Sequence, residues 1–393
     1  MTLLPQSGFD AEGWANWFWA DYLPVWLDCV QDPKGGVFDL LNAVGHPSED
    51  TSKTVLAQAR TLFTLSHLAL LSSHPELTEA AGRQATYLLR FRKRPGLYRR
   101  ALGRDGLPNG HAADEIACSY DQTFVILGLV TWNRLSPAPD LAAEIEACWE
   151  VVTTTLTDPA TGLLRNDDAA TASNPAQNPH MHLYEACLQA HEMTGEARWL
   201  TRATSLRALA LRHFFDQDSG SIAEVLTADL RPLSGSDGLR REPGHQCEWA
   251  WLLDREADLG GDPELRDTAR RLMAFADRHG FVQSGPLKGA AYDAVSSTGA
   301  VMDETHLLWP QTEAIKIFAT HHIGGDPVSG ARAKALLCLM FEGWFAGRPT
   351  FVNQLDSKGT TLWPEALTRL FYHLALALTE GARAGLWPGI ARQ

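Results

Sequence analysis

Apolar residues recur every three to four positions over long stretches of the chain. This spacing places apolar side chains on one face of a helix, so it predicts helices rather than strands. The clearest stretches are residues 15–27, 55–71, 76–90, 141–155 and 199–215. We therefore expect an all-α protein built from long amphipathic helices.

Short segments rich in glycine and aspartate separate these helices, and they resemble one another. They are DPKGGVFD from Asp32, RPGLYRRAL from Arg94, DPATGLLRND from Asp158, DQDSGSIAEV from Asp216, RHGFVQSGPL from Arg278 and GRPTFVNQLD from Gly347. Their central turn residues fall near positions 36, 96, 162, 220, 280 and 347, a period of about 60 residues. Self-similarity of this length is typical of stacked supersecondary units.

Each repeat holds about two helices and a turn with a short extended stretch, and six repeats account for residues 1–393 as one domain. No low-complexity linker, capping repeat or run of charge interrupts the series. The pattern therefore predicts an (α/α)6 barrel, a closed ring of helical hairpins whose inner helices line a central cavity. An open solenoid and a bundle of two domains are the alternatives.

Charge and cysteine content narrow the class of protein. The 34 basic and 47 acidic residues give a net charge of −13, which argues against nucleic acid or an anionic membrane as a partner. The first residues lack a basic segment followed by an apolar stretch, and no apolar run approaches the roughly 18 residues of a membrane span. The six cysteines are scattered, which is typical of reduced thiols. We expect a soluble, cytoplasmic protein; its oligomeric state does not follow from the sequence.

One polar or aromatic residue recurs near the start of the second helix of each hairpin. These residues are Arg60, Tyr120 with Asp121, His182, His245, Trp309 and His373, at successive intervals of about 60 to 64 positions. Because each hairpin contributes one of them at the same point of its repeat, we expect them to lie at a similar height on the inner wall.

The repeat also separates neighbouring histidines. His180 and His182 are two positions apart and cannot share a helix face, so we expect His182 in the cavity and His180 at the surface. His182 and His245 each have a glutamate three positions later, Glu185 and Glu248, on the same helix face. The histidines outside the repeat are expected at helix caps or in solvent: His67, His111, His191, His213, His321 and His322.

Two chemistries that such a ring could support have weak sequence signals. Three histidines can bind zinc with water in the open position, but the chain contains neither H-x-x-x-H nor H-E-x-x-H. Glycoside hydrolysis needs two opposed carboxyl groups, for which Asp121, Glu248, Asp303 and Glu304 are available. A hydrolase does not require three inward histidines and an arginine.

Proton transfer next to a carbonyl group would use more of these inward residues than zinc binding or glycoside hydrolysis would. Histidine titrates near neutrality, so it can remove and return a carbon-bound proton. Arg60 can stabilise the enediolate oxygen that develops. Trp249, Trp251 and Trp309 offer apolar faces for a sugar ring, although Trp251 fits equally well as a core residue.

Several segments resemble the N-acylglucosamine 2-epimerase superfamily over nearly the whole chain. They are GGVFDLL, QARTLF, YDQTF, NPHMHLYEA, PGHQCEWAWLL, LWPQTEA and FYHLALAL, of which PGHQCEW is the most specific. The resemblance implies an (α/α)6 barrel and a sugar isomerase or epimerase that needs neither a metal nor a cofactor.

The resemblance also implies roles for single residues. Arg60, His182, His245 and His373 match the active-site arginine and histidines of the family, and Glu248 matches the carboxylate that orients His245. His245 would help to open the sugar ring, and His373 would move a proton between C2 and C1 through a cis-enediolate. The expected substrate contacts are Asn178, Trp309, Glu248, Tyr120, Asp121 and Glu185.

Two departures from the family pattern bear on the substrate. Cellobiose 2-epimerases carry Pro-Tyr-His with a tryptophan shortly before it, whereas this chain has Phe-Tyr-His at His373 and its nearest upstream tryptophan is Trp363. The N-acylglucosamine branch has no histidine at the position of His182. Both departures favour an aldose–ketose isomerase of a free monosaccharide, with mannose and fructose as the leading pair. A 2-epimerase, a glycoside hydrolase and a non-catalytic sugar-binding ring are the alternatives.

Overall fold

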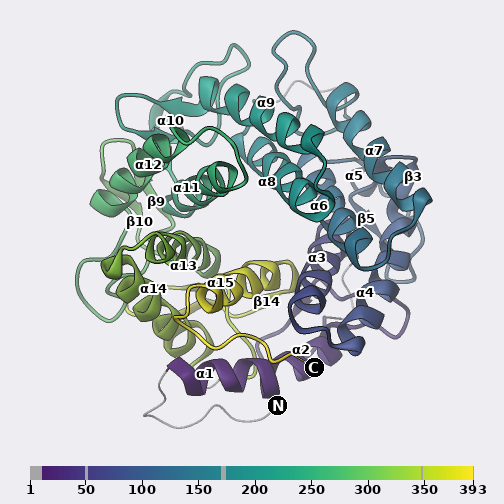
Figure 1. Ribbon diagram of the computed structural model, residues 1–393, viewed down its shortest axis with the longest axis horizontal. Coiled ribbons are helices and arrows are strands. Elements are labelled where there is room, and N and C mark those ends of the chain that lie inside the picture. Colours follow the sequence, from purple (N-terminus) through teal and green to yellow (C-terminus); the bar gives the residue numbers. More distant parts are fainter. Residues whose placement is uncertain (1–10, 49–51, 170–173, 347, 393) are drawn as a thin grey trace.

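The computed structural model describes residues 11–48, 52–169, 174–346 and 348–392, and it is a ring of two helical layers (Figure 1). The inner layer comprises α3 (Val55–Ser72), α6 (Ser119–Leu135), α8 (Gln177–Thr194), α11 (Pro243–Asp258), α13 (Leu308–Ile323) and α15 (Phe371–Arg383). The outer layer comprises α1 (Ala11–Trp17), α2 (Leu23–Val30), α4 (Pro75–Leu88), α7 (Pro139–Thr154), α9 (Ala197–Phe214), α12 (Leu265–His279) and α14 (Pro327–Met340). Shorter helical segments are η1 (Phe18–Tyr22), η2 (Leu89–Phe91), α5 (Ala112–Glu115), α10 (Gly235–Leu239), η3 (Phe341–Phe345) and η4 (Thr368–Leu370).

The ring closes between the first and last repeats, as an (α/α)6 barrel requires. Strand β1 (Leu40–Leu41) pairs antiparallel with β14 (Ala366–Leu367), and α15 packs beside α3. The helices near the N-terminus complete the outer layer there, where Trp26 of α2 stacks on Phe371 of α15 with ring centroids 3.7 Å apart. The predicted all-α toroid is therefore confirmed, and an open solenoid is excluded for the described part of the chain.

The order of the hairpins differs from the sequence-based expectation. The packed pairs that are consecutive in sequence begin with the inner helix, as in α3 with α4 and α8 with α9, whereas α15 ends the series and has its outer neighbours near the N-terminus. The connections within a pair are short, such as Ser73–His74 and Gly195–Glu196, and the longer Gly/Asp segments join each outer helix to the next inner one. The repeat period alone does not reveal which helix of a pair comes first.

The inner helices are buried on nearly every side, because they lie between the outer layer and the central polar residues. In α3 this burial extends to polar side chains such as Gln58, Arg60 and Thr64. The outer helices are amphipathic, and in α12 the buried positions Leu265, Ala269, Leu272 and Ala276 recur every three to four residues. The apolar core thus fills the space between the two layers.

The Gly/Asp segments form tight turns with short antiparallel strands, as predicted. Gly36, Gly96, Gly162 and Gly220 have φ between 69° and 76°, a left-handed conformation that disfavours other residues. Gly280 instead ends α12 with φ of −89°, and residue 347 lies outside the described residues. The remaining strands are β2 (Lys53–Thr54), β3 (Arg92–Arg94), β4 (Leu97–Tyr98), β5 (Ala101–Leu102), β6 (Phe215–Asp216), β7 (Ser221–Ile222), β8 (Arg240–Arg241), β9 (Ala294–Ser296), β10 (Val301–Asp303), β11 (His306–Leu307), β12 (Gln354–Leu355) and β13 (Thr361–Trp363).

A buried glutamine on each of four inner helices fastens the preceding turn to its helix. The side chain of Gln122 accepts from the backbone N–H of Tyr98 and donates to its carbonyl, both at 2.9 Å. The same two-bond arrangement joins Gln58 to Val37, Gln246 to Ile222 and Gln311 to Ala291. We call these four side chains the amide clamps. Each satisfies both hydrogen-bonding groups of a buried turn residue.

His180 takes the corresponding position on α8, so its expected surface location is wrong. Its side chain is fully buried, its Nε2 accepts from the backbone N–H of Leu164 at 2.9 Å, and its Nδ1 donates to the carbonyl of Ala176 at 3.0 Å. The helix-face argument correctly directed His180 away from the cavity. It did not show that this direction leads into the interface between the two layers.

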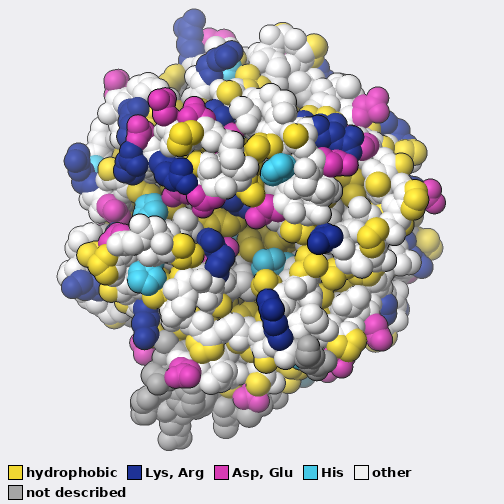
Figure 2. All heavy atoms as spheres, in the orientation of Figure 1, with side chains coloured by type: hydrophobic (Ala, Val, Ile, Leu, Met, Phe, Trp, Pro, Cys, Tyr) yellow, Lys and Arg dark blue, Asp and Glu magenta, His cyan; other side chains and the backbone are white. Residues whose placement is uncertain are grey.

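Figure 2 shows that the centre of the ring is hollowed on the face drawn, with charged side chains around an apolar floor. Over the described residues, no helix combines the length and the hydropathy that crossing a membrane requires.

We predict that replacing Gln122 by methionine lowers the free energy of unfolding by about 2 to 6 kcal/mol. The change leaves two buried backbone groups of Tyr98 unpaired, at about 1 to 3 kcal/mol each. Urea unfolding of the purified variant measures this loss. The control is Gln31→Met, because Gln31 is half-buried and its side chain makes no hydrogen bond to a described residue. Equal stability of the two variants would contradict a structural role for the clamp.

Candidate active site

A cavity of about 240 Å³ opens at the end of the ring where the inner helices begin. It is lined by Arg60, Tyr120, Asn178, His182, Glu242, His245, Glu248, Leu307, Trp309, Asn353, Trp363, Leu367, Arg369, Leu370 and His373. The structure therefore brings together most of the residues that the repeat singled out. Glu242, Asn353, Trp363 and Arg369 are additions that the sequence analysis did not propose as site residues.

Some of the expected contacts lie behind the cavity wall. Asp121 is buried outside the lining, and its burial raises the pKa of the carboxyl to about 7. Glu185 lies beneath His182 and lines a separate cavity of about 290 Å³. The indole N–H of the buried Trp249 donates to Gln177 at 2.7 Å, and Trp251 packs against the Lys316 ammonium. Of the three tryptophans considered from the sequence, Trp309 alone lines the cavity.

His373 has its two ring nitrogens in different environments. Its Nδ1 lies 2.8 Å from Glu313 Oε1, and its Nε2 lies 3.3 Å from a guanidinium nitrogen of Arg60. Burial, with the positive charges of Arg60 and Lys316, lowers the pKa of His373 well below its usual range. The ring is therefore neutral, with its proton on Nδ1 and its Nε2 lone pair directed to Arg60.

Glu313 is held by a second buried charge. The Lys316 ammonium lies 2.5 Å from Glu313 Oε2, one helical turn along α13, and both side chains are fully buried. Burial alone would lower the pKa of Lys316, but Glu313, Glu248 and Glu185 together raise it. The ammonium thus compensates the carboxylate that accepts the hydrogen bond from His373 Nδ1–H.

Arg60 reaches the cavity from the second turn of α3. One of its nitrogens donates to the Tyr120 hydroxyl at 2.7 Å, and the other donates to the carbonyl of Arg369 at 3.3 Å as well as to His373. Its guanidinium lies over the ring of Phe124, 4.0 Å from the centroid. All of these partners are uncharged, so the guanidinium keeps its full charge for an anion in the cavity.

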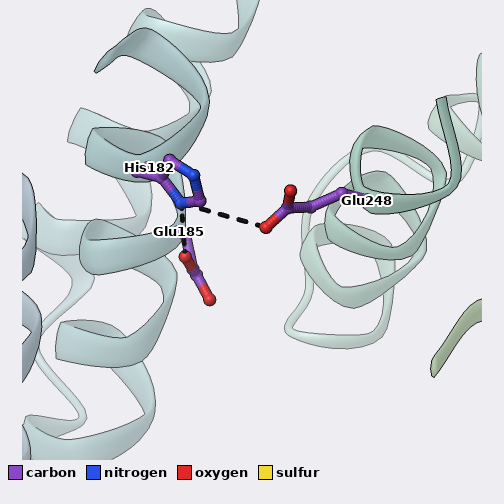
Figure 3. A group of neighbouring side chains, drawn as sticks. All are labelled: His182, Glu185 and Glu248. Carbon is purple, nitrogen blue, oxygen red and sulfur yellow. Dashed lines mark hydrogen bonds and ion pairs between the residues drawn. The ribbon is translucent and has the colours of Figure 1, made fainter. Parts of the chain in front are cut away.

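His182 and Glu185 form a buried pair on α8, with Glu248 facing them from α11 (Figure 3). His182 Nδ1 donates to Glu185 Oε2 at 3.0 Å, and the Tyr372 hydroxyl donates to the other oxygen of Glu185. Burial lowers the pKa of His182 to about 4. His182 is therefore neutral as well, and its Nε2 is the nitrogen left for the cavity.

Glu248 does not orient His245, contrary to the expectation from the family resemblance. Its Oε1 lies 3.9 Å from His182 Nδ1 and makes no hydrogen bond within the described part of the chain. Burial, reinforced by the negative charge of Glu313, raises the pKa of Glu248 well above its usual range. The raised pKa favours the protonated form of this carboxyl, which can donate a hydrogen bond into the cavity.

His245 is oriented by two other carboxylates. Its Nδ1 lies 2.7 Å from Glu224 Oε2 and 3.3 Å from Glu242 Oε2, and its ring lies 4.7 Å from that of Trp309. Burial would lower the pKa of His245, but Glu224 and Glu242 outweigh it and raise the pKa to about 10. His245 therefore carries a positive charge at neutral pH.

Glu224 was missed by the sequence analysis, although a signal for it exists. It follows the clamped residue Ile222 by two positions, as Asp39 follows Val37 in the first Gly/Asp segment. Aligning the segments on their turns would have placed an acidic residue beside the start of the next inner helix. Glu224 also accepts from the backbone N–H of Glu242 at 2.9 Å, which holds it beside His245.

Two groups of side chains have ligand atoms close enough together to hold a metal ion. They are His182 with Glu185 and Glu248, and His245 with Glu224 and Glu242; within each group the ligand atoms lie within 4.8 Å of one another. Neither group contains two of the three histidines. The three-histidine zinc site considered from the sequence is therefore not formed by the described residues.

Comparisons with known proteins identify the family of the chain. The family model described as N-acylglucosamine 2-epimerase (GlcNAc 2-epimerase) matches residues 36–377. A mannose-6-phosphate isomerase of Rhizobium meliloti (strain 1021) is 27% identical over 392 residues, covering 97% of each chain. A D-mannose isomerase of Marinomonas mediterranea is 24% identical over 310 residues, covering 75% of each chain.

The fold of the chain also matches solved structures. A crystal structure of D-mannose isomerase aligns with a TM-score of 0.82 and 20% sequence identity, covering 96% of this chain and 100% of that chain. The family that the sequence motifs indicated is thus confirmed by a match over most of the chain. The protein belongs to the N-acylglucosamine 2-epimerase family of sugar isomerases and epimerases.

Proposed function

We propose that the protein is an aldose–ketose isomerase that interconverts D-mannose and D-fructose by proton transfer, without a metal ion. The observation that carries this proposal is the opposite protonation of two histidines in one cavity. His373 is neutral and His245 is positively charged at neutral pH. Titratable groups whose pKa values are driven apart are typical of a paired general base and general acid.

In the proposed reaction His373 Nε2 takes the C2 proton of the open-chain aldose. The electron pair of that bond forms the C1–C2 double bond of an enediolate, and the former carbonyl oxygen O1 becomes negatively charged. The imidazolium then returns the proton to C1, while the hydroxyl proton of O2 passes to O1. The atoms balance without any co-reactant, and one base on one face of the enediolate suffices for both steps.

Arg60 is the proposed group that stabilises the enediolate. It lies beside His373 Nε2, where the proton is removed, and its other contacts are to neutral groups. A planar guanidinium can donate to O1 and O2 together, which a single ammonium cannot do in the same geometry.

His245 is the proposed acid for opening the sugar ring. Its positive charge, maintained by Glu224 and Glu242, allows it to protonate the ring oxygen as the C1–O5 bond breaks, while the anomeric hydroxyl releases its proton to solvent and becomes the carbonyl. The indole of Trp309 lies against the His245 ring and faces the cavity, where the apolar face of a sugar can stack. Asn178 and His182 provide polar groups for its hydroxyls.

A second neutral histidine favours one alternative, a sugar 2-epimerase. Epimerisation needs proton-transfer groups on both faces of C2. The unprotonated Nε2 of His182 can take up the C2 proton on one face, and the proton for the other face then comes from a protonated histidine such as His245. Product analysis distinguishes the two reactions, since mannose yields fructose with an isomerase and glucose with a 2-epimerase. Glucose as the first product would overturn the proposed isomerisation.

We predict that Arg60→Lys lowers kcat roughly 100- to 1000-fold, the usual loss when an oxyanion donor is removed. Lysine keeps the charge but loses the planar set of donors. Steady-state kinetics with mannose measures the loss, with Arg83→Lys on the exposed surface of α4 as the control. Near-normal turnover of the Arg60 variant would assign Arg60 a structural role.

We predict that His373→Asn stops the entry of solvent deuterium at C1 and C2 of the sugar, with a loss of roughly 10²- to 10⁴-fold in turnover. Proton NMR in deuterated water follows the exchange. His213→Asn on the outer helix α9 is the control. His245→Asn should harm a short aldose that cannot cyclise less than it harms mannose. Exchange at the wild-type rate in the His373 variant would make His245 the candidate base.

The lowered pKa of His373 and the raised pKa of His245 together predict a broad pH optimum of kcat/KM. His373 must be deprotonated, and its pKa is well below 6.5, so activity rises with pH on a limb below that value. His245 must be protonated, so activity falls as the pH passes about 10. Glu224→Gln removes a charge that raises the pKa of His245 and should move the alkaline limb to lower pH, leaving the acid limb in place.

The control for this profile is Glu76→Gln, which removes a carboxylate from an exposed position on α4. If the alkaline limb of the Glu224 variant coincides with those of the wild type and the control, His245 is not the acid that defines it.

A further inference from the structure

We propose that Arg369 forms a binding site for an anionic substituent on the substrate, a phosphate ester or a carboxylate carried by the sugar. This inference rests on the proposed function and extends it from mannose itself to derivatives of mannose that carry an anionic group, on which the same isomerisation takes place. The site is the part of the cavity wall formed by η4, next to the start of α15.

The Arg369 guanidinium has no partner of its own within the described part of the chain. The residue is half-buried and lines the cavity, yet its side chain forms neither a hydrogen bond nor an ion pair with any described residue. Its backbone is well held, since its carbonyl accepts from Arg60 and the neighbouring Thr368 hydroxyl donates to the carbonyl of Phe38 at 2.5 Å. A rigid backbone with an unpaired charged side chain is typical of a binding group.

A second guanidinium lies beside it. Burial, and then the positive charge of Arg60, lower the pKa of Arg369 below its usual range. Among the described residues, the hydrogen-bond partners of Arg60 are all neutral: the Tyr120 hydroxyl, His373 and a backbone carbonyl. Two like charges in one cavity are costly unless a counter-ion arrives, and a bound anion provides it.

The nearby carboxyl groups do not supply that counter-ion. Asp39 accepts from the backbone N–H and hydroxyl of Thr54 at 2.9 and 2.5 Å, and neither Asp39 nor Asp121 forms an ion pair with Arg369. The pKa of Glu248 is raised, and Glu242 is shared between His245 and Arg240. Asp39 and Asp121 attract the Arg369 guanidinium at longer range, but no carboxylate among the described residues pairs with it, so its donors are left for an anionic group on the substrate.

A permanent anion explains the second guanidinium better than the transient enediolate does. Arg60 already lies beside His373 Nε2, where the enediolate would form. A guanidinium binds a phosphate or a carboxylate through two parallel hydrogen bonds, which suits a fixed group on the substrate.

The first experiment compares kcat/KM for mannose, mannose 6-phosphate and mannuronate in the wild type and in Arg369→Gln. We expect the wild type to prefer one of the anionic sugars, and the variant to lose about 10- to 150-fold on that sugar, the effect of a hydrogen bond to a charged group. The loss on mannose, which carries no anionic group, should be clearly smaller. The preferred sugar distinguishes the phosphate from the carboxylate. Arg212→Gln, on the exposed face of α9, is the control.

Two kinetic outcomes would overturn the proposal. One is a wild-type preference for mannose over both anionic sugars. The other is an equal loss on all three sugars in the Arg369 variant, which would make Arg369 a second group acting on the enediolate.

A binding experiment keeps this inference separate from the proposed reaction. Mannitol and mannitol 1-phosphate have no carbonyl group and cannot isomerise, so calorimetry measures their affinity even if the protein fails to convert any sugar. We expect mannitol 1-phosphate to bind more tightly than mannitol, and Arg369→Gln to abolish the difference. Where kinetics selects mannuronate, mannonate replaces the phosphate in this comparison. Equal affinity of the anionic and neutral alditols for the wild type would refute the site.

Discussion

The amide clamps connect the fold of this protein to its cavity. A glutamine such as Gln58 or Gln311 satisfies both backbone groups of one turn residue, so the turn cannot shift along the inner helix without leaving buried groups unpaired. Each clamp lies one or two positions along the helix from a residue that lines the cavity. In chain order, these cavity residues are Arg60, Tyr120, His245 and Trp309. His180 likewise lies two positions before the cavity residue His182. On α3, α6, α8, α11 and α13, the contact that fastens the preceding turn to the helix therefore also sets the depth of a site residue.

Two histidines of the cavity, His373 and His245, differ in protonation because the carboxylates that they contact have different neighbours. His373 and His245 each present Nδ1 to a carboxylate, at 2.8 and 2.7 Å. The one carboxylate at His373 is compensated by Lys316, whereas His245 faces two carboxylates, of which Glu242 alone has a cationic partner, Arg240. Burial then keeps the first imidazole neutral, and the excess negative charge beside the second keeps it protonated. Distance to the nearest acid alone would not distinguish them.

Much of this architecture is encoded locally in the sequence. Apolar positions at helical spacing predict the helices, because amphipathic helices bury one face against a neighbouring layer. The period of about 60 residues predicts the ring, since each hairpin repeats the same turn chemistry, visible in the positive φ of Gly36, Gly96, Gly162 and Gly220. Position within the repeat also indicated that Arg60, His182, His245 and His373 share one cavity, because equivalent points of stacked units lie at equal heights.

The partners of those residues depend on contacts between segments far apart in the chain. Sequence spacing suggested Glu248 for His245, since both lie on one helix face, but Glu224 reaches the imidazole from the preceding turn 21 residues away. His180 lies on the correct helix face, yet only the packing of the two layers shows that this face is buried. The sequence by itself determined the helical ring and the residue types that line it. Only the tertiary structure decided which charges compensate one another, because burial and charge pairing depend on distances across the ring rather than on positions along it.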